Sequence, residues 1–361
     1  MKKNFFATTP GIMVVGAVIG VLAIVLQKLG NPANMGICVA CFERDIAGAL
    51  GLHRAAVVQY VRPEILAFVL GSLLASIATR EFRPRGGSAP LTRFLLGMVA
   101  ALGALVFLGC PWRAILRLAG GDANALFGFA GLAAGVFIGT LFFRRGYSLG
   151  RSVPQSTGAG LVFPALVLAL LLCALFFPQI AGQAKSGPLF YSAKGPGSMH
   201  APFWIAFGCA LIIGVIAQRS RFCTMGALRD LFLFRQTHLF MGILALFVCA
   251  LIMNCATGGF HFGFEKQPVA HTESLWNFCG MMTAGLAFAL AGGCPGRQLF
   301  MAGEGDSDAA LFALGMLVGA AFAHNFGTAS SGAGLGPYGI HATVIGFLVC
   351  LVIGFAHCKR A

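Results

Sequence analysis

Two short stretches combine a cysteine with residues that interrupt a helix. Gly109-Cys110-Pro111-Trp112-Arg113 and Gly293-Cys294-Pro295-Gly296-Arg297 lie 184 residues apart, and both stand inside strongly apolar sequence. Glycine and proline end one helix, and the next helix then begins with free amide groups. Helix N-termini attract anions, and Arg113 and Arg297 each add a positive charge three residues after the cysteine. The pattern predicts a site for a small oxyanion.

A second pair of cysteines repeats at nearly the same offset. Cys38 is followed by Arg44-Asp45, and Cys223, 185 residues later, is followed by Arg229-Asp230. The chain therefore reads as two related halves, each with two cysteines where an apolar segment is interrupted. Charges at membrane depth are costly and are usually paired, so we expect both arginine–aspartate pairs to be salt bridges that support the breaks.

The composition identifies a membrane protein. Hydrophobic residues make up 58% of the chain, charged residues 10%, and the mean hydropathy is +0.85. A soluble domain carries about 25% charged residues, so this chain could not cover a water-facing surface. The net charge of +14 would suggest nucleic acid in a soluble protein, but here the lipid bilayer is the expected partner and nucleic acid is not.

A transmembrane helix needs about 20 mostly apolar residues. The expected spans are 10–28, 63–79, 92–109, 124–143, 160–178, 201–217, 237–256, 275–292, 308–324 and 340–356. The segments after the four cysteines are too broken to span, so we expect them to be re-entrant pieces or short half-helices. The fold class is an all-α polytopic membrane protein.

Basic residues orient these spans. Lys2-Lys3, the arginines between 80 and 93, those between 144 and 151, and Lys359-Arg360 are expected to be cytoplasmic, together with both termini. Five spans in each half then make the halves inverted repeats whose broken helices meet near the membrane centre. The expected divisions are 1–159 for the first repeat with its connecting loop, 160–200 for the fifth span and a linker, and 201–361 for the second repeat.

Cys38 and Cys41 have a Cys-x-x-Cys spacing, which lowers a thiol pKa and is typical of redox pairs. The counterpart of Cys41 in the second half is Gly226, so the pair is not repeated. No second close pair of cysteines and no matching histidine spacing indicates zinc. We expect neither a metal site nor a cofactor.

The stretch Arg221-Phe222-Cys223 and the repeated Gly-Cys-Pro breaks resemble the YeeE/YedE sulphur-transport family of bacterial inner-membrane proteins. Asn34-Met35-Gly36-Ile37-Cys38-Val39-Ala40-Cys41-Phe42-Glu43-Arg44-Asp45 is similar to the YedE-like branch associated with selenium metabolism. The resemblance extends over nearly the whole chain. It implies an hourglass-shaped protein of the inner membrane that takes up thiosulfate, with central cysteines touching the passing ion.

The family's cysteine role transfers to Cys110, Cys223 and Cys294, with Cys38 as the further repeat-related position. Cys41 departs from the thiosulfate-type pattern, which favours a selenium- or sulfur-containing relative of thiosulfate as substrate. The resemblance also implies a separate TusA-like sulfur-carrier protein as a cytoplasmic partner.

These inferences predict a permease, not an enzyme, for a small sulfur or selenium anion. Its path is a ladder of the thiols of Cys38, Cys110, Cys223 and Cys294, because a thiol donates weak hydrogen bonds and sulfur is a soft partner. The expected supporting residues are Cys41, Arg113, Arg297, Arg44, Asp45, Arg229 and Asp230. Two alternatives stay open: a membrane thiol–disulfide oxidoreductase that uses Cys38 and Cys41, and a soft-metal transporter.

Overall fold

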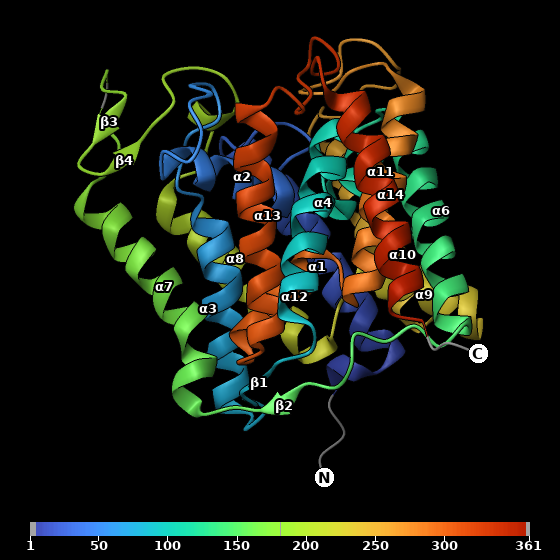
Figure 1. The fold of residues 1–361 in the computed structure, drawn as a ribbon. Coiled ribbons are helices and arrows are strands. Elements are labelled where there is room, and N and C mark those ends of the chain that lie inside the picture. Colours follow the sequence, from blue (N-terminus) through green and yellow to red (C-terminus); the bar gives the residue numbers. More distant parts are fainter. Residues whose placement is uncertain (1–4, 181, 359–361) are drawn as a thin grey trace.

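The computed structural model describes residues 5–180 and 182–358, and nearly all of the regular structure is helical (Figure 1). The helices longer than 15 residues are α1 (Thr9–Lys28), α3 (Pro63–Ala78), α4 (Pro90–Phe107), α6 (Asn124–Arg144), α7 (Thr157–Phe176), α8 (Phe203–Ser220), α10 (His238–Ala256), α11 (Ser274–Ala291), α13 (Ser307–Asn325) and α14 (Gly339–Ala356). The shorter helices are α2 (Val39–Ala49), α5 (Pro111–Ala119), α9 (Thr224–Phe234) and α12 (Pro295–Gly303), with 3-10 turns at η1 (Phe5–Ala7) and η2 (Pro196–Ser198). Two-residue strands form two small antiparallel pairs, β1 (Arg85–Gly86) with β2 (Val153–Pro154) and β3 (Lys185–Ser186) with β4 (Leu189–Phe190).

The protein is an all-α polytopic membrane protein, as the composition predicts. Within the two described ranges, nine helices are long and apolar enough to cross a membrane. Ten spans were expected, and a helix occupies each of the ten places. The tenth is α3, an apolar helix of 16 residues, which is shorter than a full crossing.

Long and short helices follow one another in the same order in α1–α7 and in α8–α14. The packing repeats as well: α6 packs on α11 as α4 packs on α13, and α1 packs on α10 as α3 packs on α8. Helices α7 and α14 follow this rule only in part. The contact of α7 with α13 matches that of α14 with α6, but α7 also packs on α3 and α12, whereas α14 packs on α4 and α11.

Glycine allows the closest of these helix contacts. A Cβ atom on Gly131 of α6 would overlap the carbonyl oxygen of Phe278 in α11. Its counterpart Gly315 in α13 faces the carbonyl oxygen of Phe94 in α4 in the same way. Small residues let helix backbones approach closely in membranes, where lipid tails weaken any hydrophobic drive for association.

The start of α1 and the end of α14 lie on the same side of the molecule (Figure 1). Lys2, Lys3, Lys359 and Arg360, which carry part of the predicted orientation, lie outside the described residues. The loop that joins α10 to α11 lies on the opposite side, where α5 ends and α6 begins.

A candidate anion site at the helix breaks

Each of the four repeat-related cysteines is the N-cap of a short helix. Cys38 precedes α2, Cys110 precedes α5, Cys223 precedes α9 and Cys294 precedes α12. The sulfur of Cys38 accepts the backbone N–H of Cys41 at 3.5 Å, and that of Cys223 accepts the N–H of Gly226 at 3.2 Å. Helices α5 and α12 begin instead with proline, whose fixed φ suits the first helical position. The sequence prediction of half-helices after the breaks is confirmed by these elements.

The second half brings its two cysteines into contact. The sulfur atoms of Cys223 and Cys294 are 3.7 Å apart, and the backbone N–H of Cys294 donates to the sulfur of Cys223 at 3.5 Å. The thiol of Cys294 in turn interacts with the backbone amide of Thr224, the first residue of α9. The N-termini of α9 and α12 therefore meet at a pair of thiols, which we call the second thiol cluster.

The first half repeats the arrangement with one more sulfur. The thiol of Cys38 lies beside that of Cys110, and Cys110 interacts with the backbone amide of Val39, the first residue of α2. Cys41 adds its thiol beside Cys38 and donates to the carbonyl oxygen of Leu108 at 3.6 Å. Cys38, Cys41 and Cys110 form the first thiol cluster, where the N-termini of α2 and α5 meet.

All five of these cysteines are buried, and the most exposed of them, Cys223, has only 7% of its surface accessible. An ion that reaches either cluster must therefore displace neighbouring side chains. The structure gives every cysteine of the chain as a free thiol, including the Cys38 and Cys41 pair. In the described ranges, no group of three or more histidine, cysteine, aspartate or glutamate side chains is placed to hold a metal ion.

The two arginines that follow the Gly-Cys-Pro breaks have different surroundings. Arg297 forms an ion pair with Glu304 at 3.0 Å. Arg113 is fully buried and forms no ion pair with any of the residues described; its Nη1 lies 3.6 Å from the sulfur of Cys41. Its guanidinium donates to four backbone carbonyl groups, those of Asn34, Leu108, Pro268 and Val269. The positive charge beside the first thiol cluster is thus hydrogen-bonded but not neutralised by a carboxylate.

The arginine–aspartate pairs are salt bridges in both halves, at 2.7 Å for Arg44 with Asp45 and 2.8 Å for Arg229 with Asp230. The first pair is buried and gains a partner that sequence reasoning missed: Arg62 also reaches Asp45 at 2.7 Å. The second pair is partly exposed. Arg62 directly precedes the proline that starts α3, and an isolated arginine at the edge of an apolar span could have indicated a buried acidic partner.

The sequence reasoning quoted two aromatic residues near the cysteines but gave their side chains no role. Trp112, in the first turn of α5, packs edge-on against Phe222, the residue before Cys223, with ring centroids 6.1 Å apart. Its ring also lies over Gly296 in the first turn of α12. The sequence could have drawn attention to Trp112, because the repeated pentapeptides differ only at Trp112 and Gly296.

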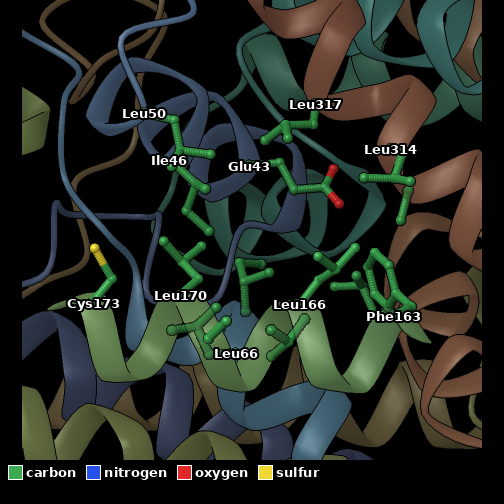
Figure 2. A pocket seen from close by; sticks show the side chains of 15 residues that line it. Glu43, Ile46, Leu50, Leu66, Phe163, Leu166, Leu170, Cys173, Leu314 and Leu317 are labelled. Atoms are coloured by element: carbon green, nitrogen blue, oxygen red, sulfur yellow. The ribbon is translucent and has the colours of Figure 1, made fainter. Parts of the chain in front are cut away.

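A separate cavity of about 420 Å³ lies between α7 and the helices α2, α3, α12 and α13. Figure 2 shows Glu43 of α2 projecting into it among leucine side chains such as Leu166, Leu170 and Leu317. Glu43 is buried, and one of its carboxyl oxygens has no hydrogen-bond partner among the described residues. None of the five clustered cysteines lines this cavity, so it is not part of the site at the breaks.

Comparison with known proteins finds a family match within the second half of the chain. Residues 219–338 match the sequence model of a family described as Sulphur transport. That segment is similar to the sulphur-transport family. It contains both cysteines of the second thiol cluster. The expected resemblance to the YeeE/YedE proteins of this family is confirmed, whereas the selenium-associated branch stays a prediction.

A curated relative agrees with this sulphur-transport assignment. Over 111 residues the chain is 32% identical to a protein of Spirochaeta thermophila named thiosulfate transporter TsuA. The alignment covers 31% of this chain and 33% of that relative. The similarity thus extends over about a third of each protein, and both comparisons are with transport proteins rather than enzymes.

Proposed function

We propose that this protein is a membrane permease that takes up a small sulfur-containing anion, thiosulfate or a selenium analogue, along the two thiol clusters. The observation that carries the proposal is the meeting of four cysteine-capped helix N-termini in two buried pairs. The sulphur-transport match over 219–338 and the thiosulfate transporter relative support the substrate class.

Electrostatics favours an anion at the breaks. Each helix N-terminus carries about half an elementary positive charge, so each pair of N-termini offers about one. Arg113 adds a charge that its carbonyl partners do not cancel. Arg297 contributes less, since Glu304 compensates it. A divalent anion that passes from one cluster to the other meets positive potential at both.

Thiols suit a site that must release its ion as well as bind it. A thiol is a weak hydrogen-bond donor, and its sulfur is soft and polarisable, so it contacts the terminal sulfur of thiosulfate without holding it tightly. Conduction requires such moderate binding at more than one site. The thiols of Cys38 and Cys110, then those of Cys223 and Cys294, form the successive contacts of the proposed ladder.

The proposal includes the architecture and the setting. The divisions 1–159, 160–200 and 201–361 form two inverted repeats in an hourglass shape, and the matching order and packing of α1–α7 and α8–α14 support this. The protein lies in a bacterial inner membrane with both termini cytoplasmic. There it delivers its substrate to a TusA-like sulfur-carrier protein.

The test is uptake of radiolabelled thiosulfate by cells that lack other sulfur importers. We expect Cys110→Ala and Cys294→Ala each to abolish uptake while the protein still inserts, because each variant removes one thiol from its cluster. A radiolabelled selenite arm in the same cells tests whether a selenium oxyanion is also taken up.

The matched control is Cys350→Ala, since Cys350 is equally buried but lies within the long helix α14 and not at a helix break. This variant should take up thiosulfate at the wild-type rate. Normal uptake by both Cys110→Ala and Cys294→Ala would refute the thiol ladder.

A further inference from the structure

The two Gly-Cys-Pro breaks differ at one position, and the two residues at that position face each other. Gly109–Arg113 and Gly293–Arg297 share glycine, cysteine, proline and arginine, and differ at Trp112 and Gly296. A Cβ atom on Gly296 would lie 3.2 Å from two carbon atoms of the Trp112 ring. The indole of Trp112 therefore occupies the space next to Gly296 that a side chain at that position would need.

The indole links the two thiol clusters. Trp112 follows Cys110 by two residues, and Gly296, under its ring, follows Cys294 by two residues. Its ring also packs against Phe222, which directly precedes Cys223. One side chain thus reaches from the break of the first cluster to the residues that flank both cysteines of the second cluster.

The indole N–H of Trp112 lies in a buried, aromatic setting. Trp112 is 1% exposed, and its Nε1 has no hydrogen-bond partner among the described residues. Phe68 and Phe300 pack around the ring at centroid distances of 5.8 and 6.1 Å and offer none. Buried tryptophan N–H groups usually find a partner, and a buried polar group without one needs an explanation.

We propose that Trp112 is a specificity-determining residue whose Nε1–H binds an oxygen of a small sulfur oxyanion between the two thiol clusters. This inference rests on the proposed function. The thiols contact the soft sulfur end of the ion, and the indole donates to its oxygen end. Ions that lack either end lose one of the two contacts.

The first test is the concentration dependence of thiosulfate uptake by Trp112→Phe, which keeps an aromatic ring but lacks the donor. Hydrogen bonds to charged acceptors are stronger than neutral ones, so the half-saturating concentration should rise roughly tenfold to a hundredfold. Trp204→Phe is the matched control, since Trp204 is 62% exposed, and it should leave uptake unchanged.

The second test measures binding without transport. The chain has three tryptophans, so Trp204→Phe/Trp276→Phe leaves Trp112 as the sole indole fluorophore. Thiosulfate added to this purified protein should shift the emission of Trp112 as its N–H gains an acceptor. If Trp112→Phe fails to insert, the emission measurement decides alone.

Failure of the proposed function and failure of the proposed role of Trp112 give different results. Wild-type protein that takes up no thiosulfate would overturn the proposed substrate, and the emission measurement, which needs only binding, would still decide the role of Trp112. Wild-type uptake with an unaltered half-saturating concentration in Trp112→Phe, or with no emission shift, would overturn the role of Trp112 alone.

Discussion

Replacing Asp45 by asparagine removes a negative charge that two buried guanidinium groups share. One carboxylate oxygen of Asp45 accepts the Nε and Nη2 of Arg44 at 3.0 and 2.7 Å, and the other accepts the Nε of Arg62 at 2.7 Å. The three side chains are at most 2% exposed. Asparagine would direct an NH₂ group at one of the two guanidinium groups, so two positive charges would stay buried without compensation.

Burial of this ion pair determines how much stability Asp45→Asn should lose. Removing one partner of a buried ion pair costs about 3–5 kcal/mol, which is roughly a hundredfold to several thousandfold in the unfolding equilibrium constant. The matched control is Asp230→Asn at the repeat-related position. Its partner Arg229 is 34% exposed and Asp230 is 17% exposed, so this change should cost about 0–1 kcal/mol.

The assay is the free energy of unfolding of purified protein in mixed micelles, measured by titration with a denaturing detergent. We expect Asp45→Asn to unfold at a much lower denaturant fraction than wild type, and Asp230→Asn to unfold close to it. Equal losses for the two variants, or a loss below about 1 kcal/mol for Asp45→Asn, would refute the claim that burial makes the first pair essential.

Three further predictions concern the thiols, the helix contacts and pH. Cys41→Ser should retain most thiosulfate uptake, because a hydroxyl can replace its hydrogen bond and the permease needs no disulfide; complete loss would favour the thiol oxidoreductase. Gly131→Ala and Gly315→Ala should each lower the free energy of unfolding, because the added methyl group overlaps a carbonyl oxygen of the facing helix. Gly208→Ala should be neutral or slightly stabilising, because a Cβ atom there would have no neighbour within 4 Å among the described residues. Burial lowers the pKa of His200, in the loop before α8, below its usual 6.5. The folded state therefore keeps the imidazole neutral, and the protein loses stability as pH falls through the unfolded-state pKa near 6.5. His200→Gln should make the free energy of unfolding less sensitive to pH between 7.5 and 5.5, and an unchanged pH profile would count against this assignment.

The helices were predictable because the signals for them are local. The expected span 124–143 became α6, Asn124–Arg144, and 237–256 became α10, His238–Ala256. An apolar run of fixed length and a proline at the first helical position depend only on neighbouring residues. The four short helices after the cysteines follow from the same rules.

The contacts that define the site were harder to predict, because they join residues far apart in sequence. The ion pair of Arg62 with Asp45 and the packing of Trp112 on Gly296 depend on how the two halves meet. Periodicity and composition do not determine such contacts. The ion pair of Arg297 with Glu304 is a different case, since seven residues are two helical turns and the spacing alone could have suggested it.

The sulfur atoms at the starts of α2 and α9 are poor choices for holding a helix end. Serine, threonine, aspartate and asparagine are the preferred residues at that position, because their oxygen accepts the amide N–H more strongly than sulfur does. Serine in place of Cys38 and Cys223 should therefore leave the architecture intact or strengthen it. Helix stability therefore does not explain the thiols there, which agrees with the proposal that their sulfur atoms contact the transported anion.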